Sequence, residues 1–367
     1  MLKTLKPNFS TLDGIRGIAA FYVVINHCRG HLLIGGGELA KIKPVAEWTM
    51  LEKVYYTLLQ ATALGSEFVI LFFVLSGFSI AYSLRNQQAL KSFYLKRFIR
   101  LYPPYIAALI WAAFTYHMID KYFHALNGES ISVFEDFNTT IRNLFYITTG
   151  DYIGQFWSLI HEVFFYLLVP FALLKKRWYY IASVVLYLVG IFIPVDFQYL
   201  NKFTEFLLKY NIYFTVGVYL YYNYDSFKKY FLISKSYVFY GILCFLFGLE
   251  VILNYLIDIN EISFFIASIA SILLIVNFLE KNITNMVIRK LGEMSYTIYI
   301  IHFASMYIFY LILLKVGVTK DVDKIMVWWV WPTGVVFCLI TAIPFYYLIE
   351  KNTKKILEYL RKDKQSS

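Results

Sequence analysis

Apolar runs of about 20 residues recur along the whole chain, and polar residues gather in the segments between them. A membrane-spanning helix needs about 20 predominantly apolar residues, because the hydrocarbon core of a bilayer is about 30 Å thick. The pattern predicts ten spans, at about 12–30, 64–84, 101–119, 157–174, 178–195, 206–222, 237–257, 261–279, 293–314 and 327–349. The predicted fold is therefore an all-α polytopic membrane helical bundle that forms one integral domain over residues 1–367.

The distribution of Lys and Arg indicates which loops face the cytoplasm, because cytoplasmic loops carry an excess of these residues. With the N-terminus placed in the cytoplasm, the segments on that side carry 22 Lys and Arg residues, roughly twice as many as the opposite side. Both termini are then predicted to be cytoplasmic. Lys3 and Lys6 before an apolar run are typical of a secretory signal, but Asp13 and Arg16 interrupt that run. We therefore interpret it as a retained first span.

Composition agrees with a bilayer environment. Of the residues, 59% are hydrophobic, 20% aromatic and only 16% charged, whereas soluble domains average about 25% charged residues. The net charge of +10 would suit nucleic acid, but its distribution follows the membrane topology, so we expect no nucleic-acid partner. Cys28, Cys244 and Cys338 all lie in apolar runs without paired spacing, which predicts reduced thiols buried in lipid or in the protein core, and no metal site.

The first predicted span carries charged and titratable residues that are costly in lipid. An Arg or Asp at the centre of a membrane helix costs about 2.5–3.5 kcal/mol on insertion scales, so such residues indicate function. Arg16 and His27 are eleven residues apart, about three turns, so they share one helix face and lie about 16 Å apart along the axis. Asp13 lies one turn before Arg16. One face of one helix thus offers a carboxylate, a cation and a base that titrates near neutrality.

A second motif, FFVLSGFSIAY at 72–82, places Ser76 and Gly77 among bulky apolar residues. A glycine in a membrane helix most often marks a position where two helices approach closely. Taken alone, the motif favours this structural interpretation.

A basic cluster precedes the third predicted span, in KSFYLKRFIRLYPPY at 91–105. Arg97 and Arg100 share a helix face, with Lys96 beside them, and Pro103 and Pro104 mark the entry to the span. One interpretation is a topogenic cluster whose long side chains reach the cytoplasmic interface. The alternative is an anion clamp, because arginine binds phosphate oxygens in a bidentate fashion.

The fourth predicted span, around FWSLIHEVFFYLL at 156–168, contains the intramembrane carboxylate of Glu162. Ser158 and Tyr166 lie one turn away on the same face, and His161 points to a neighbouring face. A buried Glu must be paired or protonated, and Arg16 is the natural counter-charge. A purely structural Arg–Glu pair between two helices remains an alternative.

The ninth predicted span, within LGEMSYTIYIIH at 291–302, aligns Ser295, Tyr299 and His302 on one face. A lone membrane histidine is equally compatible with a hydrogen bond to a neighbouring helix. Two outer loops, 31–63 and 120–156, are expected to run along the outer surface and to cover an outward-facing site, respectively. The charged residues of the second loop are compatible with simple solvation; they are Asp120, Glu129, Glu135, Asp136 and Asp151.

Taken together, these motifs resemble those of the acyltransferase-3 family of bacterial membrane O-acyltransferases. The matching motifs occur in order along the chain: Arg16-x10-His27, FFVLSGF at 72–78, Arg97-x2-Arg100, FWSLIHEVFFY around Glu162, SYTIYIIH ending at His302, and YYLIEK at 346–351. The resemblance covers roughly residues 10–352. One departure is Asn352, which stands where the family often has Pro after the final Glu-Lys.

The resemblance implies transfer of an acyl group, usually acetyl from acetyl-CoA, to a glycan hydroxyl. It implies a stand-alone member without a fused hydrolase-like domain, located in the bacterial inner (cytoplasmic) membrane. The expected partners are acyl-CoA as co-substrate, membrane lipid, and a glycan acceptor such as O-antigen, capsule or exopolysaccharide, with no bound cofactor and no metal. An alternative function is a polytopic transporter or flippase, but no symmetry between the two halves of the chain supports it.

A mechanism follows as a hypothesis. Lys96, Arg97 and Arg100 would bind the CoA phosphates from the cytoplasm, and His27 would act as general base or as carrier of the acyl group. The remaining candidate residues would set the charge balance or support the site, with Arg16 stabilising the thioester oxyanion; they are Asp13, Arg16, Glu162, Ser76, Ser158, Tyr299 and His302.

Overall fold

The computed structural model describes residues 8–32, 35–85, 90–127, 144, 151–193, 201–254, 260–283, 285–318 and 327–357. Helices make up most of these residues, and no strand occurs among them. A membrane-embedded backbone must satisfy its N–H and C=O groups internally, which a helix does within one segment. The predicted all-α polytopic bundle is confirmed.

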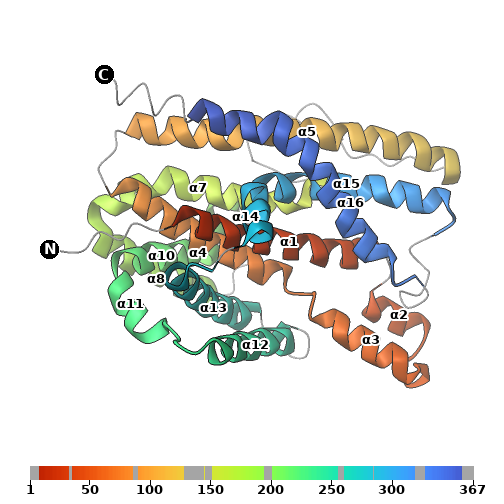
Figure 1. Ribbon diagram of the computed structural model, residues 1–367, viewed down its shortest axis with the longest axis horizontal. Coiled ribbons are helices and arrows are strands. Elements are labelled where there is room, and N and C mark those ends of the chain that lie inside the picture. The colour runs from red at the N-terminus through yellow and green to blue at the C-terminus, as the bar shows by residue number, and fades with distance from the viewer. Residues whose placement is uncertain are drawn as a thin grey trace.

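The structure contains long helices joined by short helical segments (Figure 1). The longer helices are α1 (Phe9–His31), α4 (Gly65–Leu84), α5 (Leu90–Asn127), α7 (Trp157–Ala172), α8 (Lys176–Phe192), α10 (Asn211–Tyr222), α12 (Ser236–Ile252), α13 (Asn260–Lys281), α15 (Ser295–Lys315) and α16 (Val330–Phe345). The shorter ones are α2 (Gly36–Ile42), α3 (Met50–Gln60), α9 (Lys202–Glu205), α11 (Tyr224–Phe231) and α14 (Met286–Glu293). Five further turns are 3-10 or π-helical, namely η1 (Val45–Glu47), η2 (Asp151–Phe156), η3 (Leu173–Lys175), η4 (Phe206–Tyr210) and η6 (Tyr346–Glu350).

In the described part of the chain, seven helical segments are long and apolar enough to cross a membrane. An eighth arises if α11 and α12, which are bent by 97° at their break, form one span. Together these segments cover every predicted span except 206–222, and the predicted spans 157–174 and 178–195 fall in one segment, Ile153–Phe192. The number of ten spans and the cytoplasmic location of both termini therefore stay predictions.

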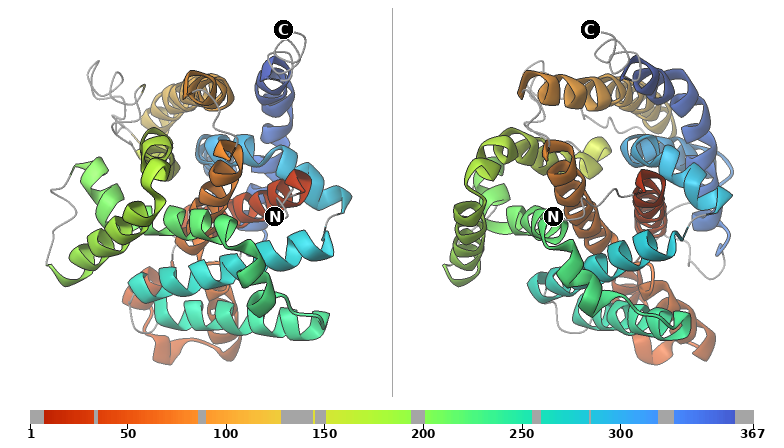
Figure 2. Two further views of the ribbon diagram at one scale, coloured as in Figure 1. Left: turned by 90° about the vertical axis from the view of Figure 1, so that its left-hand side faces the viewer. Right: turned by 60° about the vertical axis from the view of Figure 1, so that its left-hand side comes forward.

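Helix α1 lies in the middle of the bundle and packs against α4, α13, α14, α15 and α16 (Figures 1 and 2). Many of its apolar positions are fully or almost fully buried, including Leu12, Ile15, Ala19, Val23 and Val24, whereas Phe9 is 42% exposed. Much of the first predicted span therefore packs against other helices, whereas the Asp13 side chain is 42% exposed.

Two glycines allow one helix crossing, that of α4 with α10, to be very close. A Cβ atom added at Gly77 of α4 would lie 2.0 Å from the Phe214 carbonyl oxygen of α10, and one added at Gly217 of α10 would lie 2.0 Å from the Val74 carbonyl oxygen. The two backbones therefore touch where any side chain would collide. The predicted structural role of Gly77 is confirmed.

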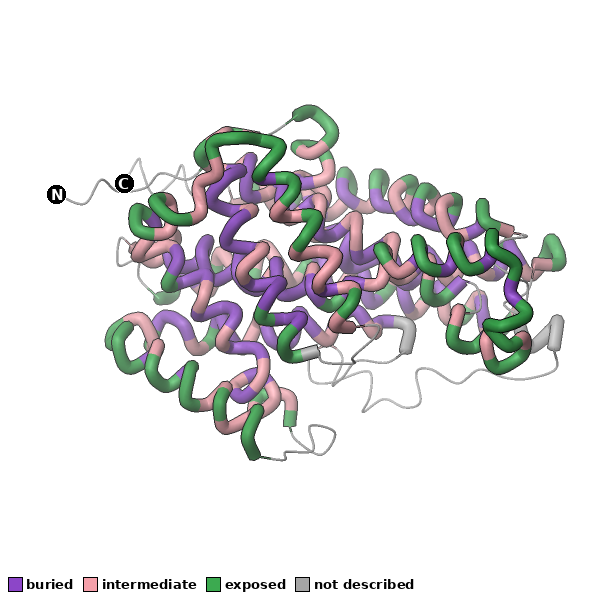
Figure 3. Tube along the Cα trace, turned by 90° about the horizontal axis from the view of Figure 1, so that it is seen from below, coloured by how far each residue is buried: buried purple, intermediate pink, exposed green. Residues whose placement is uncertain are grey.

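The outer surface of the bundle is apolar, which suits contact with lipid. Figure 3 shows buried positions facing the interior of the bundle and exposed positions along its outer faces. Large hydrophobic side chains are among the exposed ones, for example Phe192, Phe245 and Leu348, which are 77%, 68% and 72% exposed. Apolar side chains on the outer faces of a polytopic bundle contact lipid, so such exposure is expected in a bilayer.

Two segments differ from the sequence-based expectation. Helix α5 continues through Pro103 and Pro104, so the basic cluster and the following span form one helix of 38 residues. The loop 31–63 contains the two helices α2 and α3. Thr49 and Glu52 form a reciprocal cap that stabilises the start of α3. Most of the loop 120–156, including Glu129, Glu135 and Asp136, lies outside the described residues.

Candidate active site

Helices α1, α4, α5, α7 and α15 line a cavity of about 680 Å³, a volume that includes the part open to solvent. The lining consists of Arg16, Phe72, Phe73, Ser76, Ser79, Ile80, Arg97, Arg100, Leu101, Ser158, Leu159, Glu162, Tyr166, Ser295, Tyr296 and Tyr299. Candidate residues from five separate sequence segments thus meet at one pocket.

Arg16 is held in place by α1 and α4 together. Its Nη1 lies 2.8 Å from Asp13 Oδ1, and its Nη2 donates to Ser79 Oγ over 2.7 Å and to the Leu75 carbonyl. The expected ion pair between Arg16 and Glu162 is therefore wrong. Asp13 lies one turn away on the same helix and satisfies the guanidinium locally.

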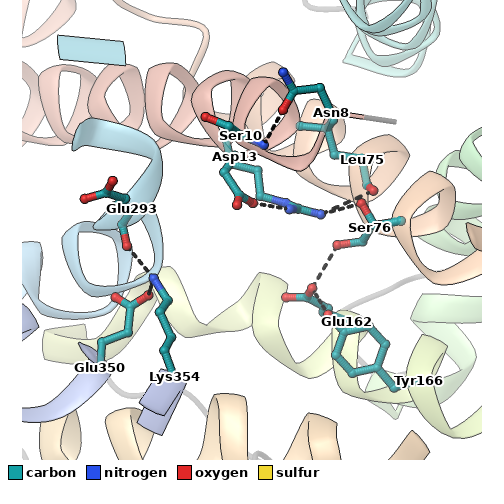
Figure 4. A network of polar contacts seen from close by, with 12 residues as sticks. Asn8, Ser10, Asp13, Leu75, Ser76, Glu162, Tyr166, Glu293, Glu350 and Lys354 are labelled. Atoms are coloured by element: carbon teal, nitrogen blue, oxygen red, sulfur yellow. Dashed lines mark hydrogen bonds and ion pairs between the residues drawn. The ribbon is translucent and has the colours of Figure 1, made fainter. Parts of the chain in front are cut away.

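Glu162 of α7 accepts hydrogen bonds from hydroxyl groups. Ser76 Oγ on α4 donates to Glu162 Oε1 over 2.8 Å, and the Tyr166 hydroxyl, one turn further along α7, donates to the same oxygen. Figure 4 shows Ser76 and Tyr166 pointing toward Glu162. No ion pair of Glu162 is present among the described residues, so this carboxylate relies on neutral donors from two helices.

The two arginines of α5 face the pocket. Arg97 lies over the rings of Phe93 and Tyr166, at 5.6 and 5.1 Å from the ring centroids. Neither Arg97 nor Arg100 forms an ion pair with a carboxylate in the part of the chain that the structure describes. Two guanidinium groups at one cavity without a carboxylate partner favour the anion-clamp interpretation. Lys96, in contrast, does not line the pocket.

One wall of the pocket is built by hydroxyl groups of α7 and α15. Ser158 Oγ lies 2.6 Å from the Tyr299 hydroxyl, which in turn donates to the Gln155 carbonyl over 2.9 Å. The predicted proximity of Ser158 and Glu162 is confirmed, since both line the cavity. Gln155 was missed by sequence reasoning, because it lies in η2, within a stretch that reads as an outer loop.

His27 does not line the pocket but pairs with His302 behind this wall. His27 Nδ1 lies 2.8 Å from His302 Nε2, and the two ring planes lie within 4° of each other with centroids 5.0 Å apart. His302 Nδ1 lies 2.7 Å from the Tyr299 carbonyl oxygen. Tyr299 thus contributes its hydroxyl to the pocket wall and its carbonyl to the histidine pair.

Comparison with known families identifies the reaction class. The family described as "Acyltransferase domain" matches residues 9–347. The chain belongs to this acyltransferase-3 family. No curated protein and no solved structure matches this acyltransferase significantly. The matched range includes the whole pocket and the histidine pair. The family indicates an enzyme that transfers acyl groups to hydroxyls, and the apolar helices indicate a multi-pass membrane protein.

Proposed function

We propose that this acyltransferase moves an acetyl group from cytoplasmic acetyl-CoA to a hydroxyl of a cell-surface or lipid-linked glycan, such as O-antigen, capsule or exopolysaccharide. We propose the bacterial inner membrane as its location. The observation that carries the proposal is the pocket in which Arg97 and Arg100 have no carboxylate partner among the described residues. A donor with several phosphate groups fits such a pair of guanidiniums.

The donor would bind with its phosphates at Arg97 and Arg100 and with its acyl-bearing arm directed along α1. Arg16 belongs to the donor side in this proposal. It lies about 16 Å from His27 along α1, and Asp13, Ser79 and the Leu75 carbonyl already hold its guanidinium. Since an oxyanion donor must lie within about 3.1 Å of the developing charge, Arg16 is too far from His27 to stabilise a thioester oxyanion there.

His27 would act as the general base. The acceptor hydroxyl attacks the thioester carbonyl carbon, its proton moves to His27 Nε2, and a C–O bond forms. When the tetrahedral intermediate collapses, the C–S bond breaks and the leaving thiolate takes the proton back from His27 Nε2. The products are the acetyl ester and free CoA thiol, and proton transfer of this kind contributes about 10²–10⁴-fold. An acyl carrier role for His27 would use the same nitrogen lone pair.

The direct experiment measures thiol release from acetyl-CoA by the purified protein, with and without candidate glycans. His27→Ala is expected to lower the rate by about 10²–10⁴-fold, with unchanged membrane abundance. His117→Ala, at an exposed position of α5, is the matched control and is expected to keep the rate. A His27→Ala variant that still transfers acetyl would exclude His27 as base. Glycan movement without thiol release would support the transporter alternative.

A further inference from the structure

The histidine pair fixes where the protons of both rings lie. The Tyr299 carbonyl is only an acceptor, so His302 Nδ1, at 2.7 Å, carries a proton. In a neutral imidazole the other nitrogen is then bare, so His302 Nε2 is an acceptor. His302 is completely buried, an environment in which a charged ring is costly unless it is paired. The neutral form with a bare Nε2 is therefore the resting state of His302.

The same reasoning continues to His27. Its Nδ1 lies 2.8 Å from the bare Nε2 of His302, and a hydrogen bond between two nitrogens needs one proton between them. That proton belongs to His27 Nδ1. The Nε2 of His27 then has a free lone pair, which is the state that a general base requires.

We propose that His302 is a positioning residue that holds His27 in the tautomer with a bare Nε2. This inference rests on the proposed function, because it assigns His27 the role of base. In this arrangement His27 Nδ1–H donates to His302 Nε2, and His302 Nδ1–H donates to the Tyr299 carbonyl oxygen. When His27 takes up the acceptor's proton at Nε2, its Nδ1–H becomes a stronger donor to His302, so the pair stabilises the cation that forms.

Packing around the two rings keeps this geometry. The Phe303 ring lies edge-on to both His27 and His302, with centroids 4.6 and 5.1 Å away. The Cys338 thiol of α16 lies 3.5 Å from the His302 carbonyl and 3.9 Å from the Cys28 thiol of α1. Phe303 therefore packs on both rings, and the two thiols link α16 to α1 and α15 beside them, as a positioning role requires.

Solid-state NMR of protein with ¹⁵N-labelled histidine rings, reconstituted in lipid bilayers, tests the tautomer directly. The signal of His27 is assigned by its loss in His27→Gln. The expected result is a protonated Nδ1 and a bare Nε2 at His27 in the unsubstituted protein. A protonated Nε2 with a bare Nδ1 would overturn the proposal.

Substitution of His302 tests the consequence for turnover. His302→Phe removes the acceptor and is expected to mix the His27 tautomers and to lower kcat by about 10²-fold or more, with an unchanged KM for acetyl-CoA. His302→Gln keeps an acceptor oxygen and is expected to restore part of kcat. His161→Phe is the matched control and is expected to keep kcat, because His161 is also buried but its ring contacts Tyr210 and Phe206 of η4.

The two proposals fail in different ways. If the purified protein releases no thiol with any acceptor, the proposed function fails, while the NMR spectrum still decides the tautomer. If His302→Phe folds and keeps full kcat, the positioning role is refuted although the acyltransferase function stands. If His302→Phe does not fold, the tautomer of the unsubstituted protein and the kcat of His302→Gln decide the question. A His302→Gln variant that folds and keeps the His27 tautomer but loses kcat completely would refute the role.

Discussion

Removal of one guanidinium from the donor pocket should weaken binding of acetyl-CoA and leave the chemical step intact. Arg97 lines the cavity, stacks on Tyr166, and has no ion pair among the described residues. A hydrogen bond to a charged group contributes about 1.5–3 kcal/mol, and each 1.4 kcal/mol is tenfold in affinity. Arg97→Gln is therefore expected to raise the KM for acetyl-CoA by about 10- to 150-fold with nearly unchanged kcat.

The assay compares two donors in the same preparation. Acetyl-pantetheine carries the thioester and the arm but none of the CoA phosphates, so it should show the same KM with the unsubstituted protein and with Arg97→Gln. Lys91→Gln is the matched control, because Lys91 lies exposed on the same helix outside the pocket. An equal penalty for both donors, or a loss of kcat with unchanged KM, would refute phosphate binding by Arg97.

Further predictions concern stability and are checked by thermal unfolding in detergent. Gly217→Ala should destabilise the protein by about 1–3 kcal/mol through overpacking, because the new Cβ would lie 2.0 Å from the Val74 carbonyl oxygen. The control is Gly241→Ala, whose Cβ meets no atom within 4 Å and which should leave the stability unchanged. Equal effects of the two substitutions would contradict the close crossing. Glu350→Ala should lower the free energy of unfolding by about 1–3 kcal/mol, because the carboxylate accepts hydrogen bonds from the Thr297 N–H and hydroxyl at the start of α15. The control is Glu47→Ala at an exposed position, which should change the free energy of unfolding by less than about 0.5 kcal/mol. An unchanged unfolding temperature for Glu350→Ala would show that the cap does not stabilise α15.

The cavity lined by Arg97 and Glu162 illustrates how far sequence reasoning reached. Helical periodicity correctly placed Ser158, Glu162 and Tyr166 on one face and Arg97 with Arg100 on another. It could not show that these faces meet at one cavity, because that depends on how separate helices pack, such as α5 against α15. The expected partner of Arg16 was wrong for the same reason: a charge in a membrane helix must be satisfied, but the helix crossings decide by which group.

The sequence by itself determined the helical class, the positions of most spans and the residues that need partners, because lipid permits few backbone structures and makes buried charge costly. Only the tertiary structure decided which partners they receive. His27 and His302 are 275 residues apart in the chain and 2.8 Å apart in space, and no local pattern encodes that contact. Their pairing follows from the packing of α1 against α15, and it is this packing that sets which nitrogen of His27 carries the lone pair.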